Sequence, residues 1–188
     1  MRIISGIFKG KKILKPKDLN TRPLKDLTKE SIFNVILHSN KLKINLINSN
    51  ILDLFSGVGS FGIECLSRGV RKVVFIENYQ GVIPILKKNV KSLKSINNYE
   101  IFESDIYNEN TFSNMNIKFD IIFLDPPYKY KNLEKIFEQI KINNILSENG
   151  IMIIHRHKSE KENFPNYIKI IEKKSYGISI ILFLSLSY

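Results

Sequence analysis

With 188 residues, 43% of them hydrophobic and 25% charged, the chain has the size and composition of one globular domain, which excludes a disordered or fibrous protein. A single cysteine, Cys65, excludes an internal disulfide and favours a reducing cytoplasm, and no apolar run reaches the roughly 20 residues of a membrane-spanning helix, so we expect no membrane attachment. The formal net charge of +11 favours a polyanion such as nucleic acid as partner, although a genome biased toward lysine produces the same surplus.

The first 40 residues indicate a basic extension. Gly6 and Gly10 interrupt short apolar pieces within residues 2–15, which predicts a small β-hairpin that carries several lysines. Apolar residues at helical spacing then predict a helix from Leu24 to about His38. We therefore expect residues 1–40 to form a hairpin and a helix that pack on a second region, residues 41–188.

From residue 50 onward, segments typical of strands alternate with segments typical of helices. Strands that recur with helical crossovers predict a parallel, doubly wound α/β sheet. Two last strands are joined through Ser175-Tyr176-Gly177 and predict an antiparallel hairpin at the edge of a mostly parallel, seven-stranded sheet. We expect strands at residues 51–55, 72–76, 100–103, 119–124, 150–155, 167–173 and 178–184, helices at 59–67, 79–93 and 133–140, and a polar loop at 108–116.

A glycine-rich turn follows the first of these strands, between Asp53 and Gly59. Gly57 and Gly59 allow the backbone to approach a ligand closely at the carboxyl end of the strand, where α/β sheets bind ligands. Residues 57–62 also match the dinucleotide pattern G-x-G-x-x-G, which alone is weak evidence. A carboxylate at Asp53 would repel a pyrophosphate but attract the positively charged amino group of S-adenosylmethionine. The alternative is an acid whose hydrogen bonds go to nearby backbone amides.

Acidic residues also follow the next two strands. Glu77 lies about 20 residues past the glycines, where an acid accepts the ribose hydroxyls of either NAD or S-adenosylmethionine. Asp105 lies where a carboxylate could read the adenine amine, although an isolated aspartate in a loop is usually a solvated turn residue. We also expect Phe55 and Ile106, which neighbour these acids, to contact the cofactor.

The most informative segment is Asp125-Pro126-Pro127-Tyr128, which directly follows a buried strand. Its two prolines make the turn rigid, as catalytic groups require. An exocyclic base amine is planar and a poor nucleophile, but hydrogen bonds from its N–H groups to Asp125 and to the Pro126 carbonyl would draw the nitrogen toward a tetrahedral geometry. Tyr128 can stack on an extruded base. We therefore predict methyl transfer to such an amine, with Asp125, Pro126 and Tyr128 as catalytic residues and Asp125 also beside the cofactor; a polar proline turn without catalysis is the alternative.

Together these segments resemble the RsmD family, bacterial methyltransferases of 16S ribosomal RNA that form N2-methylguanine. The resemblance extends over nearly the whole chain and includes residues 2–6, 9–11, 21–23, 30–34, 52–64, 75–77, 119–128 and 176–177. It implies a Rossmann-like class I methyltransferase fold, S-adenosylmethionine as methyl donor, and a guanine presented within a 30S subunit or an assembly intermediate. It also implies that Arg22 packs over the cofactor. We expect a cytoplasmic monomer that uses no metal and contacts RNA through Arg2, Lys9, Lys11, Lys12 and Tyr128.

Two positions depart from the family pattern. Members often carry an acid after the fifth strand, where this chain has His155-Arg156-His157, and an aspartate is frequent at the position of Asn78. His155 and His157 share one face of a strand, but no third metal ligand is apparent, so we interpret them as part of a basic edge that faces RNA.

Other functions fit parts of the sequence. The Asp-Pro-Pro-Tyr turn also occurs in adenine-N6 and cytosine-N4 amino-methyltransferases of DNA or RNA. An RNA-binding assembly factor without catalysis and an NAD-dependent enzyme are further alternatives. The segments at residues 2–12 and 21–23, rather than the catalytic turn, favour the RsmD family over them.

Overall fold

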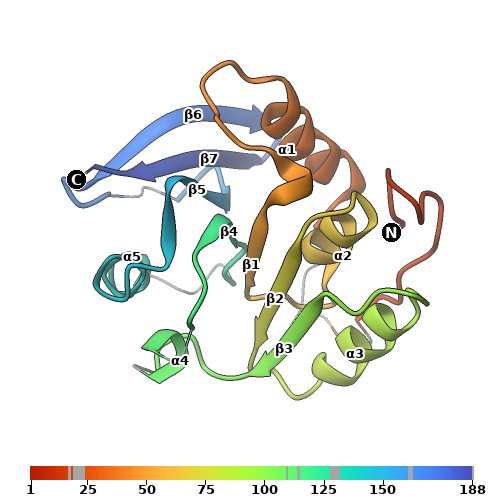
Figure 1. The fold of residues 1–188 in the computed structure, drawn as a ribbon. Coiled ribbons are helices and arrows are strands. Elements are labelled where there is room, and N and C mark those ends of the chain that lie inside the picture. Colours follow the sequence, from red (N-terminus) through yellow and green to blue (C-terminus); the bar gives the residue numbers. More distant parts are fainter. Residues whose placement is uncertain are drawn as a thin grey trace.

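The apolar runs of the chain pair into one sheet. In the computed structural model, which describes residues 1–16, 18, 24–108, 110–113, 115–127, 132–160 and 163–187, seven strands lie in the order β3-β2-β1-β4-β5-β7-β6 (Figure 1). Strands β1 to β5 are parallel, whereas β7 runs antiparallel to both β5 and β6. This order confirms the predicted mostly parallel sheet with an antiparallel hairpin at its edge. The strands are β1 (Asn50–Leu54), β2 (Lys72–Glu77), β3 (Tyr99–Glu103), β4 (Phe119–Leu124), β5 (Leu146–His157), β6 (Ile168–Tyr176) and β7 (Ser179–Leu186).

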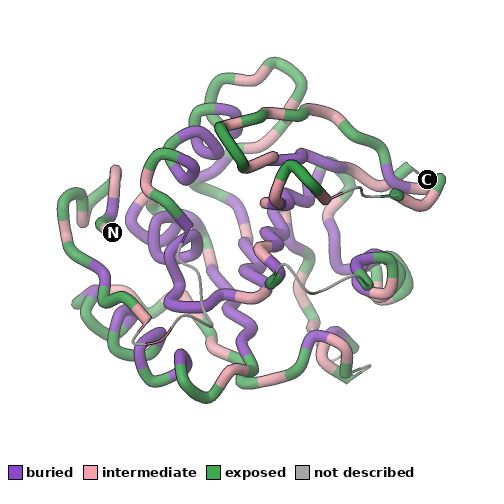
Figure 2. Tube along the Cα trace, turned by 180° about the vertical axis from the view of Figure 1, so that it is seen from behind, coloured by how far each residue is buried: buried purple, intermediate pink, exposed green. Residues whose placement is uncertain are grey.

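Helices cover both faces of the sheet, because successive side chains of a strand point to opposite sides and both sides are apolar here. On one face, Phe123 of β4 packs in a cluster with residues of α1, α2 and α3; on the other, its neighbour Leu124 packs with α4 and α5. Figure 2 shows the resulting buried layers on either side of the strands. The helices are α1 (Asp26–His38), α2 (Ser60–Ser67), α3 (Ile83–Lys91), α4 (Asn110–Ser113) and α5 (Leu133–Ile142), with a 3-10 turn η1 (Leu46–Asn48) before β1.

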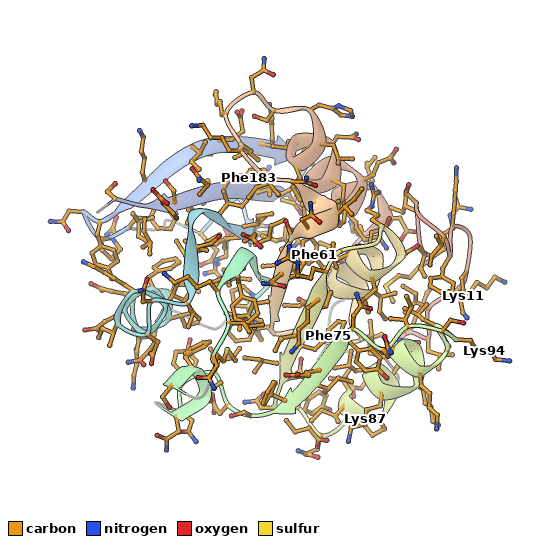
Figure 3. The ribbon with its side chains drawn as sticks, viewed as in Figure 1. Lys11, Phe61, Phe75, Lys87, Lys94 and Phe183 are labelled. Atoms are coloured by element: carbon orange, nitrogen blue, oxygen red, sulfur yellow. The ribbon has the colours of Figure 1, made fainter. Side chains whose placement is uncertain are left out.

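A column of aromatic rings connects α1 to β4. Phe33 stacks on Phe61 of α2 at 5.4 Å between ring centroids, and Phe61 stacks on Phe123 at 4.1 Å. All three rings are at most 2% exposed, and Figure 3 shows Phe61 in the interior between α2 and the sheet. Because Phe123 precedes Asp125 by two residues, this packing supports the strand end that carries the predicted catalytic acid.

The amino-terminal segment folds back on itself as expected for a hairpin, but it does not form two regular strands. Residues 1–13 contain only an isolated antiparallel bridge between Arg2 and Lys12, with Ile3 N donating to Lys11 O at 2.9 Å and Gly10 N donating to Ile3 O at 2.9 Å. The segment is also held by long-range contacts to α2, which no local pattern reveals. Ile3 is 1% exposed and belongs to the same core cluster as the strands. The division of the chain at residue 40 stays a prediction.

A buried carboxylate makes several of these long-range contacts. Glu64 of α2 accepts hydrogen bonds from Ile4 N at 2.8 Å and Ser5 N at 2.9 Å, and it also pairs with Lys29 at 3.4 Å and Arg68 at 2.9 Å. Lys29, whose side chain is fully buried, donates to the Arg2 carbonyl at 2.8 Å. Burial lowers the pKa of Lys29, while the charge of Glu64 acts in the opposite direction. The extension is therefore joined to α2 by an ion pair inside the protein.

Element boundaries differ in a few places. Helix α3 begins at Ile83, after a turn at Tyr79–Val82, rather than at residue 79. Strand β5 begins four residues earlier than expected, at Leu146. The loop at 108–116 contains the short helix α4, which buries Phe112. Among the described residues, no helix is both long and apolar enough to cross a membrane.

Candidate functional site

The carboxyl ends of three neighbouring strands bring acidic residues to one edge of the sheet. β1 lies between β2 and β4, and its register pairs Leu54 with both Ile76 and Leu124. Glu77 and Asp125 therefore lie on either side of the residue that follows β1. The helix after β1 packs on one face of the sheet and the helix after β4 on the other, so this edge is the topological switch point where open α/β sheets bind ligands.

The glycine-rich turn after β1 is held in a left-handed conformation at several positions. The φ angles are 58° at Phe55, 56° at Gly57 and 84° at Gly59. The backbone angle at residue 59 favours glycine, and a Cβ there would also lie 2.6 Å from the end of the Leu86 side chain of α3, which would have to move. Ser56 anchors the turn, since its hydroxyl donates to Asp53 O at 2.6 Å and its N–H to Ile76 O at 3.1 Å.

Glu77 organises this turn through its carboxylate. Its Oε2 accepts from Gly57 N at 2.7 Å, and its Oε1 accepts from Asn78 N and Tyr79 N, each at 2.9 Å. A carboxylate offers about four acceptor positions, so one remains on Oε2 for a ligand hydroxyl. The predicted bond to both ribose hydroxyls therefore requires one backbone amide to share or release the carboxylate.

Asp53 is almost completely buried, with 1% exposure. Its Oδ2 accepts from Gly62 N at 2.9 Å, which is the backbone arrangement considered as the alternative to ligand binding. Burial raises the pKa of the Asp53 carboxyl well above its usual value; the Gly62 hydrogen bond lowers it, and the charges of Asp125 and Glu77 raise it further. The site therefore has an acid that a neighbouring positive charge would help to ionise.

The end of β4 carries the predicted catalytic turn. The Asp125 side chain is 22% exposed, and its Oδ1 lies 2.9 Å from Nδ1 of His155. On the other side of the ring, His155 Nε2 lies 3.0 Å from Ser179 Oγ. Pro126 is buried and Pro127 is exposed. Tyr128 and Arg22, both predicted at the site, lie outside the described residues.

His155 makes a contact at this site that was not predicted from the sequence. Its side chain is 12% exposed and lies against Asp125, and its predicted place on a basic edge that faces RNA stays a prediction. The order of the strands explains this contact. Strands β4 and β5 are parallel neighbours with Leu124 paired to Ile154, so Asp125 and His155, the next residues, lie beside each other. His157 turns away to Ser159, with Nδ1 and Oγ 2.7 Å apart.

The other residues singled out in the sequence differ in burial and in their hydrogen bonds. Asp105 is exposed after β3, and its Oδ1 accepts from Tyr107 N at 2.9 Å, as in an aspartate-capped turn; Ile106 beside it is buried. Cys65 is fully buried, and this burial raises the pKa of its thiol, so it is not an accessible nucleophile. Within the described ranges, no cluster of three or more potential metal ligands is found.

The basic residues of the extension lie on the side of α3. Arg2, Lys9 and Lys12 are exposed, and Lys11 Nζ donates to the carbonyl of Ser92 just after α3. Figure 3 shows Lys11, Lys87 and Lys94 projecting outward on this side of the molecule. Lysines from two separate segments therefore contribute to one positively charged side.

Comparisons with known proteins give a consistent result. The family model described as Conserved hypothetical protein 95 matches residues 1–185. The chain is 30% identical over 183 residues to ribosomal RNA small subunit methyltransferase D of Haemophilus influenzae, covering 95% of this chain and 90% of that protein. It is 32% identical over 181 residues to the candidate rRNA methyltransferase YlbH of Bacillus subtilis, covering 95% of each.

Solved structures are similar over nearly the full length as well. A candidate methylase of Haemophilus influenzae has a TM-score of 0.75 at 29% identity, and the match covers 97% of this chain and 96% of that one. A candidate methyltransferase of Escherichia coli has a TM-score of 0.82 at 23% identity, covering 100% and 98% of the two chains, which establishes a shared fold.

Proposed function

Because this chain belongs to the Conserved hypothetical protein 95 family, the RsmD family that its motifs resemble, we propose that it methylates the exocyclic N2 amine of a guanine in 16S ribosomal RNA. It is a class I methyltransferase that uses S-adenosylmethionine. The observation that carries the proposal is the position of Asp125, a partly exposed carboxylate at the end of β4, beside a rigid proline turn and the switch point.

The residues at the switch point fit S-adenosylmethionine better than a dinucleotide. Three carboxylates, from Asp53, Glu77 and Asp125, suit a positively charged ligand with hydroxyl groups and would repel a pyrophosphate. Ser60, the first residue of α2, has a buried hydroxyl with no hydrogen-bond partner in the described part of the chain, as expected where a ligand completes a site.

The cofactor would be held by the acids and the turn between them. We assign Asp53 to its amino group, Glu77 to its ribose, the turn at Phe55, Gly57 and Gly59 to close backbone contact, and Asp105 with Ile106 to its adenine. When bound, S-adenosylmethionine supplies a methyl group, which leaves its sulfur as the amine nitrogen gains an N–C bond and loses one proton.

The role of this chain in the reaction is to orient the amine. An ionised Asp125 accepts one N–H and the Pro126 carbonyl accepts the other, so the nitrogen lone pair is free to attack. Because Pro126 is buried and follows a central strand, both acceptors are held by the rigid part of the fold. Tyr128 stacks on the base in this proposal.

The proposal is tested by mapping the methyl group. The enzyme is incubated with labelled S-adenosylmethionine and either naked 16S RNA or small subunits from a strain that lacks the enzyme, and the RNA is digested for mass spectrometry. Methylation of guanine N2 is expected, with the better substrate deciding between free RNA and a 30S particle or assembly intermediate. Methyl on adenine N6 or cytosine N4, or on DNA only, would contradict it. We further propose that the enzyme acts in the cytoplasm, where such an RNA substrate is made. We also propose that it acts as a monomer.

Phosphate contacts are predicted for the basic extension. Replacing Lys9, Lys11 and Lys12 by glutamate should weaken RNA binding and reduce the dependence of log Kd on log salt by about 0.7–0.9 per lost phosphate contact. The control replaces Lys135 and Lys141 of α5 and Lys169 of β6, the strand at the opposite edge of the sheet from β3. If log Kd depends on log salt equally in the two triple variants, the extension does not contact the RNA.

A pH dependence of cofactor binding follows from Asp53. Burial raises the pKa of this carboxyl in the free protein, whereas an ammonium group nearby stabilises the ionised form. Affinity for S-adenosylhomocysteine should therefore increase as pH rises through the raised pKa, up to the pKa of the ligand's own amino group, with release of a proton on binding. Calorimetry in buffers of different ionisation enthalpy measures this proton. A pH-independent affinity without proton release would show that Asp53 does not bind the amino group of the cofactor.

A further inference from the structure

A chain of hydrogen bonds extends behind the proposed catalytic carboxylate. It runs from Asp125 Oδ1 to His155 Nδ1 at 2.9 Å, and from His155 Nε2 to Ser179 Oγ at 3.0 Å. The three side chains come from the ends of β4, β5 and β7, which are adjacent in the sheet (Figure 1). The proposed methyl transfer gives His155 and Ser179 no role, yet His155 directly contacts the group that orients the amine.

The strand register sets this arrangement. β5 pairs with β4 in parallel and with β7 in antiparallel orientation, with His157 opposite Ser179. Because side chains alternate along a strand, residues 155 and 179 lie on the same face of the sheet as Ile153 and Ile181, which belong to one core cluster. Three strands, rather than flexible loops, therefore determine where the imidazole lies.

The hydrogen positions follow from the chemistry of the partners. An ionised carboxylate only accepts hydrogen bonds, so His155 Nδ1 must carry a proton whenever Asp125 is ionised. In the neutral ring, Nε2 then accepts from the Ser179 hydroxyl. Asp125 thus selects the tautomer that donates to Oδ1, and the Ser179 hydroxyl, which can donate or accept, satisfies Nε2 in that tautomer. Oδ2 is left to accept the substrate amine.

We propose that His155 is a positioning residue, which holds the Asp125 carboxylate in one rotation through its Nδ1–H, with Ser179 holding the far side of the ring through Nε2. The inference rests on the proposed amine methylation. The terminal torsion of an aspartate is soft, whereas an oriented acceptor must be held within roughly 0.5 Å and 10–20°. Without His155 the carboxylate samples rotations in which neither oxygen meets the amine correctly.

Two substitutions of similar polarity distinguish the hydrogen bond made by Nδ1 of His155 from the one made by Nε2. In His155→Asn the amide nitrogen lies near the position of Nδ1 and still donates to Asp125; in His155→Gln it lies near Nε2 and reaches only Ser179. We expect His155→Gln to lower kcat about 10–100-fold, with KM for RNA and affinity for S-adenosylhomocysteine little changed. We expect His155→Asn to retain most of kcat, and Ser179→Ala to have a smaller effect than His155→Gln.

A second measurement does not depend on activity. The chain contains three histidines, so 15N NMR of the imidazoles, assigned with His155→Asn, reports which nitrogen of His155 is protonated. Protonated Nδ1 in the neutral ring, lost in Asp125→Ala, is the expected result.

The outcomes distinguish this inference from the proposed function. A neutral His155 protonated on Nε2, or an active enzyme in which His155→Gln has the kcat of the wild type, would overturn the positioning role and leave methylation intact. A wild-type protein that methylates no RNA would overturn the proposed function, while the NMR result would still decide whether Asp125 and His155 share the predicted bond.

Discussion

Asp125→Ala is expected to lower kcat for RNA methylation by about 10²–10³-fold, the usual cost of removing one preorganised hydrogen-bonding group from an active site. The substitution removes the acceptor for one amine N–H while Pro126 and the cofactor residues stay in place. Single-turnover methylation with saturating S-adenosylmethionine measures the effect on the chemical step. Affinity for S-adenosylhomocysteine, measured in parallel, shows whether the cofactor site is preserved.

Asp120 provides a matched control for this experiment. It lies near the amino end of β4, the strand that Asp125 follows, and its carboxylate accepts from Asn50 N and the Ser147 hydroxyl, each at 2.8 Å. Asp120→Ala should reduce stability without changing kcat per folded molecule. If Asp125→Ala and Asp120→Ala have the same kcat, Asp125 has no part in catalysis and the proline turn is only structural.

The largest effect on stability is expected for Glu64→Gln. The substitution keeps the shape of the side chain but removes the charge that compensates Lys29, which is fully buried. Loss of one partner of a buried ion pair typically costs about 3–5 kcal/mol. Asp26, at 3.8 Å from Lys29 and 38% exposed, is a weaker second partner. Urea unfolding followed by circular dichroism measures the change in the free energy of unfolding.

An exposed ion pair of the same type serves as the comparison. Lys72 and Glu100 are paired between β2 and β3, with side-chain exposures of 30% and 49%. Glu100→Gln should change the free energy of unfolding by less than about 1 kcal/mol. In addition, replacing Lys29 by methionine in the Glu64→Gln background should recover part of the loss, because the fully buried charge of Lys29 is then removed. Equal effects of Glu64→Gln and Glu100→Gln would show that the internal pair is not needed.

The middle of the sheet could be predicted from the sequence because its central strands are buried on both faces. Phe119–Leu124 is apolar except for Asp120 and was predicted to the residue. Strand β5 was predicted to begin too late, since Glu148 and Asn149 near its start are exposed and polar. The four-residue helix α4 is too short to produce a hydrophobic period. Local patterns therefore identify the buried parts of elements better than their ends.

The amino-terminal segment shows a different limit. Its glycines predicted that the segment folds back on itself, but not the contacts with Glu64 and Ser67, about 60 residues away in the chain, that hold it. At the site, the acids at the strand ends could be placed by topology alone. The contact between Asp125 and His155 also required the order of the strands, and the three amides on Glu77 required the conformation of the turn. Interactions between distant segments account for what sequence patterns missed.

The close packing of Gly6 against α2 has a consequence for how this enzyme can be re-engineered or compared with its relatives. A Cβ on residue 6 would lie 1.8 Å from the Ser67 carbonyl, and the Ser67 hydroxyl donates to Ser5 O at 2.6 Å. The basic segment is thus not an interchangeable module. A chimera that carries residues 1–12 into another methyltransferase must also transfer Lys29, Glu64 and Ser67, since these residues make the hydrogen bonds that hold the segment.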